Sequence, residues 1–329
     1  MATEVSRSRR ALTLAAGAAA LTSAWSAPAC AADYPSGPLR IVVPYPAGGF
    51  NDTLGRLVAK HLSAAWKVSA VVDNKPGAGT MIGTQAVATA PADGQTLLVI
   101  QFPFAANPWL YKLPYDTERA FAPVILAGRS PMVLVTHSGS PYRNVADVRA
   151  AARANPGKIS YGTSGAGSSN HLAMVLFESQ AGVQMNSVPY KGSAPLMTDL
   201  AGGHVGLAVD LVPQVLPFIQ AGKARALAIA SQRRSALLPD VPTAAEIGLP
   251  GYEVSSWHGF VVPSGTPQPV IDKLNREINR ILADDEVQRV FAAQGVTPDG
   301  GSPAVLRDFI ANQMALWKRV IDQHGIKAE

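Results

Sequence analysis

The feature that most constrains the fold is a short apolar strand that runs through a Pro/Gly turn into a helix. The strand is expected at residues 39–43 and the turn at 44–49, and apolar residues then recur at helical spacing over 54–62. A second and a third strand follow before residue 101, each reached through a helix. Strands that alternate with helices predict a parallel sheet with crossover helices, that is, an α/β fold.

The same alternation of strands and helices continues to the end of the chain. A length of 329 residues allows two domains, and no linker divides the chain, so the domains are expected to exchange strands. The elements expected beyond the first helix are strands at 68–72, 96–100, 133–136, 159–161, 186–189, 206–209 and 226–230, and helices at 81–90, 145–154, 194–201, 269–282 and 303–324.

The N-terminal residues 1–31 are typical of a cleaved export signal. Arginines at positions 7, 9 and 10 precede an apolar stretch at 11–24, and a small-residue cleavage site lies near Ala31. Both the general secretory and the twin-arginine routes fit this pattern. Cys30 is the single cysteine, so the cleaved chain would have no disulfide, and we expect an exported, soluble protein.

Charge and motif content argue against several functional classes. The formal net charge of +5 is small and scattered, which does not favour nucleic-acid binding. The six histidines include no pair spaced by four residues, so no metal site is expected. The chain has no phosphate-binding Walker motif and no intact dinucleotide fingerprint, so no cofactor is expected either.

Two loops have the composition of anion cradles. The turn at 44–49 and the loop at 162–170 each follow a strand, contain Gly or hydroxyl residues, and open a helix. Helix starts present unpaired N–H groups, which bind anions without a formal cation. Thr163 and Ser164 are expected to contact a ligand, whereas Ser168 or Ser169 could equally cap its own helix.

The sequence alone leaves open the roles of three further residues and one alternative function. Asp210, at the end of a strand, could face the same cleft or accept neighbouring backbone N–H groups. Tyr45 and Phe102 are candidate ring walls, although single aromatic residues more often belong to a core. An exported serine hydrolase is the alternative function, because Ser164, Asp210 and His258 occur in the chain order of such enzymes.

Taken together, these segments resemble the Bug receptors, the exported solute-binding proteins of tripartite tricarboxylate transporters. The resemblance covers nearly all of the chain after residue 33. It rests on the segments 34–35, 41–49 with Asp52, 74–79, 91–98, 161–168 with His171 and Leu172, 188–193, Asp210, 222–228 and 263–267.

The resemblance implies a two-domain clamshell of the periplasmic binding-protein type (type II-like), with two crossover hinge strands. Domain one would comprise residues 33–128 and 256–329, and domain two residues 129–255. The protein would bind a small carboxylate, a di- or tricarboxylate or an aromatic acid, without catalysis. It would act in the periplasm, as a monomer, and dock on a membrane permease or on a sensor protein.

The resemblance also transfers a set of ligand-binding positions, which we combine with the two candidate ring walls. Asn170, residues 174–175 and the strand before Asp210 depart from the family pattern, which leaves the ligand undefined. The candidate ligand-binding residues are Tyr45, Pro46, Ala47, Gly48, Gly49, Asp52, Phe102, Thr163, Ser164, Gly167, Ser168, Ser169 and Asp210.

Overall fold

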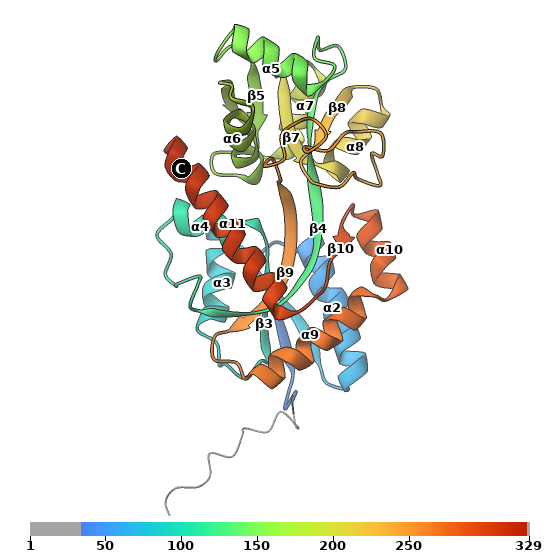
Figure 1. The fold of residues 1–329 in the computed structure, drawn as a ribbon. Helices are drawn as coiled ribbons and strands as arrows, with labels where there is room; N and C mark the ends of the chain where they lie inside the picture. The colour runs from blue at the N-terminus through green and yellow to red at the C-terminus, as the bar shows by residue number, and fades with distance from the viewer. Residues whose placement is uncertain (1–33, 328–329) are drawn as a thin grey trace, which may run out of the picture.

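The computed structural model describes residues 34–327 and shows an α/β protein with two lobes joined by long strands (Figure 1). The predicted signal sequence and its cleavage site lie outside the described residues. None of the helices within 34–327 combines the length and the apolar character needed to cross a membrane.

Lobe one, at the bottom of Figure 1, is built on three parallel strands in the order β2-β1-β3. The strand β1 is almost wholly buried, because helices cover both faces of a parallel sheet. Gly55 lets the first helix lie close to this sheet, since a Cβ there would come within 2.9 Å of Val43 Cγ2. The elements are β1 (Leu39–Val43), α2 (Phe50–Trp66), β2 (Ala70–Asn74), the 3₁₀ turn η2 (Ala78–Thr80), α3 (Met81–Ala88), β3 (Thr96–Ile100) and α4 (Phe102–Leu110).

Lobe two repeats this plan at the top of Figure 1, with β5 parallel to both β6 and β7. Its sheet is completed by a strand that runs antiparallel to the long strand entering from lobe one. The elements are α5 (Val145–Ala154), β5 (Ser160–Thr163), α6 (Ser169–Ala181), β6 (Asn186–Pro189), α7 (Ser193–Ala201), β7 (Leu207–Leu211), α8 (Val212–Gln220) and β8 (Ala224–Ile229).

Two long antiparallel strands, β4 (Phe121–His137) and β9 (Ser255–Pro263), connect the lobes. They pair with each other as far as the Pro131–Ser255 position, after which β4 pairs with β7 and β8 in lobe two. These are the two crossover strands that the family resemblance implied. The chain then returns to lobe one through α9 (Gln268–Leu282), α10 (Asp285–Ala293) and β10 (Thr297–Pro298).

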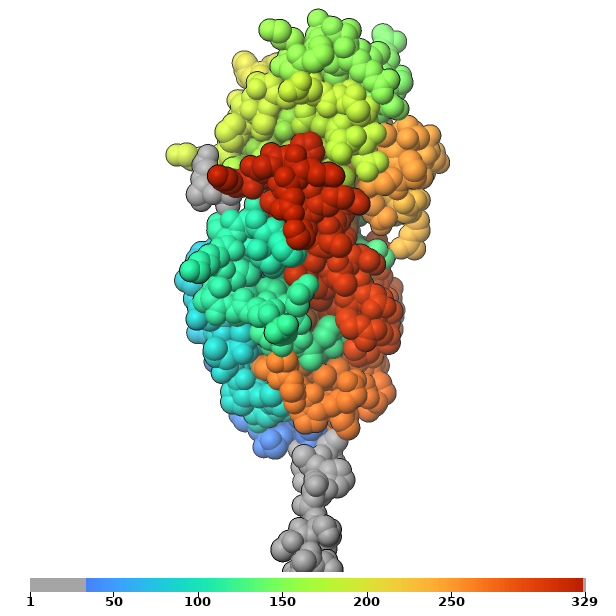
Figure 2. Space-filling model, turned by 60° about the vertical axis from the view of Figure 1, so that its left-hand side comes forward, coloured from blue at the N-terminus to red at the C-terminus, as the bar shows by residue number. Residues whose placement is uncertain are grey.

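The last helix, α11 (Pro303–His324), lies across both lobes (Figures 1 and 2). It packs against α4 of lobe one and α6 of lobe two. Its fully buried Trp317 meets Phe102 edge-to-face, with ring centroids 5.1 Å apart. One hydrophobic core therefore continues beneath α11 from one lobe into the other.

Several elements differ from the sequence predictions. β2 begins two residues later than expected, and β4 is far longer than the predicted 133–136 strand. Five elements were not predicted: α4, α8, α10, β9 and β10. Both α4 and α8 contain an internal proline, which usually signals a loop.

Candidate functional site

A cavity of about 490 Å³ lies between the lobes, at the carboxyl ends of their parallel strands. Its size is in the range of small-molecule sites, and its position is where open α/β sheets bind ligands. Residues of lobe one, lobe two and the two hinge strands all contribute. The lining residues are Gly79, Gln101, Phe102, Pro103, Asn107, Leu110, Tyr111, Met132, Ala166, Gly167, Ser168, Ser169, Asn170, Ser193, Asp210, Leu211, Gln214 and Ser256.

The first turns of four helices line this cavity. The residues involved are Gln101 before α4, Ser168 before α6, Ser193 in α7 and Leu211 before α8. Each helix start carries unpaired N–H groups and a positive partial charge. Among the described residues that line the cavity there is no lysine, arginine or histidine. An anion bound in this cavity would therefore be held by helix dipoles and polar groups, without a formal cation.

The loop before α6 is held by its own hydrogen bonds. Ser168 caps the helix, because its Oγ accepts from the backbone N–H of His171 at 3.2 Å and donates to the Gly165 carbonyl at 2.7 Å. The Gly167 N–H donates to His171 Nδ1 at 3.1 Å. Burial lowers the pKa of His171, which keeps this nitrogen available as an acceptor. The capping interpretation of Ser168 is thus confirmed.

The hydroxyls expected to contact a ligand are engaged within the protein. Ser164 Oγ donates to Asn170 Oδ1 at 2.8 Å, and the side-chain amide of Asn170 in turn donates to the Val209 carbonyl at 2.7 Å. Thr163 is 1% exposed, and its Oγ1 accepts from the Gly165 N–H at 3.4 Å. These contacts fix the shape of the loop that presents residues 166–169 to the cavity.

The turn after β1 does not line the cavity, although it lies at the same edge of the sheet. Asp52 accepts from the Gly48 N–H and from Arg56 Nε, both at 3.0 Å, and from Asn74 Nδ2 at 3.0 Å. Asn74 Nδ2 also donates to the Tyr45 carbonyl at 3.2 Å. The hydrogen bond to Arg56 does most to hold the pKa of Asp52 below its usual range. Asp52 therefore shapes this turn from behind.

Asp210 ends β7 beside the cavity and is only 2% exposed. Its Oδ1 accepts from the Leu211 N–H at 2.8 Å, whereas its Oδ2 is enclosed and has no hydrogen-bond partner. Burial raises the pKa of the Asp210 carboxyl, and polar contacts with Ser193, the Leu211 N–H and Asn170 oppose this increase. Asp210 is thus both a backbone acceptor and a residue of the cavity wall.

The hydrolase arrangement is not assembled in this structure. His258 Nδ1 lies 2.7 Å from Asn51 Oδ1, and the His258 ring meets Phe50 edge-to-face. Ser164 is bonded to Asn170 instead. Burial lowers the pKa of His258 to about 3, so this imidazole is a buried neutral group of lobe one.

The structure brings together only part of the candidate set. Phe102, Gly167, Ser168, Ser169 and Asp210 line the cavity. The other candidates, which remain predictions as ligand-binding residues, are Tyr45, Pro46, Ala47, Gly48, Gly49, Asp52, Thr163 and Ser164.

Sequence reasoning missed several polar residues of the wall. Gln101 lies directly before an unpredicted helix, and its Nε2 donates to Ser256 Oγ on the hinge strand at 2.7 Å. Gln214 lies in α8, which was also unpredicted. Ser193 was not missed: it belongs to the segment 191–193 before a predicted helix, which the sequence places at the edge of the site, and it lines the cavity.

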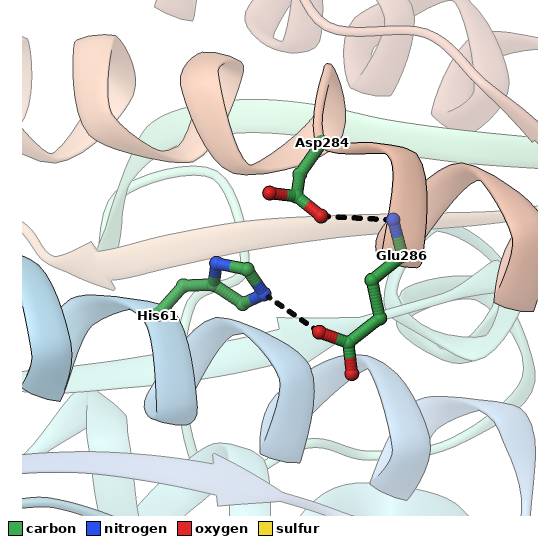
Figure 3. Close-up of side chains that lie close together, drawn as sticks. All are labelled: His61, Asp284 and Glu286. Carbon is green, nitrogen blue, oxygen red and sulfur yellow. Dashed lines mark hydrogen bonds and ion pairs between the residues drawn. The ribbon is translucent and has the colours of Figure 1, made fainter.

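A cluster of His61, Asp284 and Glu286 lies away from the cavity, between α2 and the start of α10 (Figure 3). Their ligand atoms lie within 4.8 Å of one another, which a metal ion could bridge. However, Lys60 Nζ is 2.7 Å from each oxygen of Glu286, and Asp284 caps α10 through the Glu286 N–H. The cluster is explained by ion pairing between helices.

Fold and site together define a two-lobed solute-binding protein, and comparison with known proteins specifies the family. Residues 54–326 match the model of the tripartite tricarboxylate transporter family receptor. Protein BugT of Bordetella pertussis is 38% identical over 309 residues, covering 93% of this chain and 95% of BugT. The chain belongs to the tripartite tricarboxylate transporter receptor family.

Solved structures agree with this assignment. The R. palustris protein Rpa4515, determined with adipate, is 37% identical in sequence. The match covers 90% of this chain and 100% of the Rpa4515 chain, with a TM-score of 0.74. A TctC solute-binding protein from Polaromonas, determined with no ligand, is 28% identical in sequence. The match covers 88% of this chain and 99% of the Polaromonas chain, with a TM-score of 0.80.

Proposed function

We propose that this chain is a periplasmic receptor that captures a small carboxylate in the cavity between its lobes and passes it to a membrane permease. The convergence of four helix N-termini on a cavity without lining cations carries this proposal. Two observations about relatives support it: the family is that of transporter receptors, and Rpa4515 was determined with adipate.

The proposal includes closure of the lobes around the ligand. The present arrangement corresponds to an open form, because residues 46–49 of the turn after β1 are exposed and stand outside the cavity. The higher TM-score with the ligand-free Polaromonas protein, despite its lower sequence identity, supports this assignment. Closure would bring Gly48 and Gly49 onto the ligand and would add the first predicted loop to the site. Such closure requires that the ligand bind the closed form more tightly than the open form.

The domain boundaries belong to the same proposal. Residues 33–128 with 256–329, and residues 129–255, would move as two bodies about the point where β4 and β9 separate, near Pro131. Because α11 packs on both lobes, its contact with α6 has to slide or open during closure. We further propose that the receptor is monomeric and has no enzymatic activity.

Thermal-shift measurements with a panel of acids test this function. The panel contains adipate, succinate, malate, citrate and benzoate, with putrescine and glucose as cationic and neutral controls. A ligand at about 100 times its Kd adds roughly 2.7 kcal/mol to the free energy of unfolding, which raises Tm by several degrees. We expect at least one acid to do so, and a shift with only putrescine or glucose would refute the carboxylate assignment.

A cavity-filling variant locates the binding. Ser169→Phe places a ring in the cavity wall and should abolish the shift, whereas Ser179→Phe puts the same ring on an exposed position of the same helix and should preserve it. An equal response of both variants would place the bound acid elsewhere. Hydrolysis of an ester that depends on Ser164, tested with Ser164→Ala, would contradict the absence of catalysis.

A further inference from the structure

Asp210 is the one formally charged side chain among the described residues that line the cavity. The cavity is built to attract an anion, so a carboxylate in its wall requires an explanation. Oδ1 is satisfied by the Leu211 N–H, but Oδ2 is enclosed and receives no hydrogen bond. A buried carboxylate oxygen without a donor in hydrogen-bond distance is unfavourable, because burial removes its hydration and the polar contacts with Ser193 and Asn170 replace it only in part.

The surroundings of Asp210 act on its charge in opposite directions. The start of α8, directly after Asp210, favours the ionised form through its N–H groups. Desolvation outweighs this effect and raises the pKa. A second carboxylate in the same cavity would compete for the same helix dipoles and would repel Asp210. When two carboxylates share a site, one of them is driven to hold a proton.

We propose that, when a carboxylate enters the cavity, the Asp210 side chain turns Oδ2 toward it and takes up one proton from solvent, and that Oδ2–H then donates a hydrogen bond to that carboxylate. This inference rests on the proposed function and specifies how the site accepts its ligand. No covalent bond other than the O–H bond forms or breaks. A hydrogen bond from a carboxylic acid to a carboxylate is short and strong, so it replaces repulsion by attraction.

Other titratable groups near Asp210 do not offer the same chemistry. His171 on α6 uses Nδ1 as an acceptor for the Gly167 N–H, and burial lowers its pKa, so it is uncharged near neutral pH. Asp199 on α7 accepts from the Tyr190 hydroxyl at 2.9 Å. Arg129 on β4 is paired with Asp299. The titratable or charged side chains on the elements around Asp210 are Tyr111, Arg129, His137, Tyr161, His171, Glu178, Tyr190, Lys191, Asp199 and Arg225, of which only Tyr111 lines the cavity.

Calorimetric titration with adipate, in two buffers of different ionisation enthalpy, measures the proton directly. If adipate produces no thermal shift, the panel acid with the largest shift is used. We expect binding at pH 7 to take up close to one proton. Above the pKa values of the pair, Kd should rise with pH by up to about tenfold per unit.

Asp210→Asn keeps the size of the side chain and supplies an uncharged donor, so it should bind without proton uptake and with a flat pH profile. Asp240→Asn, at an exposed position of lobe two, should behave like wild type.

Three results would overturn this inference while leaving the proposed function intact. The first is binding by wild type without proton uptake, and the second is uptake that persists in Asp210→Asn, which would assign the proton to another group or to the acid itself. The third is loss of binding in a folded Asp210→Asn protein, which would mean that an uncharged hydrogen-bond donor at this position is not what the ligand requires. Asp210→Ser, read in the same way, replaces Asp210→Asn if that variant does not fold. If no panel acid binds at any pH, the proposed function itself fails and this inference fails with it.

Discussion

Replacing His258 tests how strongly burial controls the chemistry of lobe one. The His258 side chain is fully enclosed on β9, where its ring contacts Phe50 and Nδ1 lies 2.7 Å from Asn51 Oδ1. Burial lowers its pKa from the ordinary value of 6.5 to about 3. As pH falls, the unfolded chain therefore binds a proton at this residue before the folded protein does.

The sign and size of the effect follow from this difference in pKa. The stability contribution of neutral His258 is complete above pH 6.5 and is lost progressively as the pH falls toward 3. Each pH unit within that window lowers the free energy of unfolding by about 1.4 kcal/mol, so roughly 2 kcal/mol is lost between pH 6.5 and 5. Burial also lowers the pKa of His171, which contributes with the same sign, so the share of His258 is the difference between wild type and a His258 variant.

Urea unfolding at intervals between pH 7.5 and 5 measures this loss. His258→Asn retains an amide donor toward Asn51, and it should be less stable than wild type at pH 7.5 but should show a much flatter pH dependence. The exposed His204→Asn variant should follow the wild-type profile. Equal slopes for wild type and His258→Asn would refute the assignment of the acid sensitivity to His258.

Three further outcomes are expected. Asp52→Ala leaves the donors of Gly48 and Asn74 without their acceptor, so it should lower the free energy of unfolding by about 1–3 kcal/mol. It should also weaken acid binding, and unchanged binding would contradict a role for this turn in the closed form. Phe102→Ala should cost about 3–5 kcal/mol and also reduce binding, whereas Phe104→Ala, in the same core but outside the cavity, should reduce stability alone. Glu286→Gln breaks the exposed ion pair with Lys60 and a longer contact with His61, and it should leave urea unfolding almost unchanged; a large loss would mean that this cluster stabilises lobe one.

The alternation of strands and helices was readable from the sequence because it depends on local patterns. The helices Val145–Ala154 and Pro303–His324 have the bounds that their periodicity and flanking residues predicted. The missed helices α4 and α8 contain Pro108 and Pro217, whose local signal for a loop is overridden by tertiary packing. The full length of β4 was hidden for a related reason, since its pairing partners lie far away in the sequence.

The site was only partly predictable, because it depends on which strand ends face the hinge. Both β1 and β3 end at the same edge of lobe one, but β3 pairs with the hinge strand β9, so the residues after β3 line the cavity. The sequence shows a Gly-rich turn after β1 and only an inconspicuous Gln101-Phe102 after β3. Strand order, which is a tertiary property, decides between them.

A crystal structure with the panel acid that gives the largest thermal shift tests the central claim most directly. We expect a carboxylate group of that acid to accept hydrogen bonds at the starts of α4 and α6, and the closed lobes to bring Gly48 and Gly49 into the same site. An acid bound outside the cavity, or bound there through lysine or arginine side chains, would contradict it.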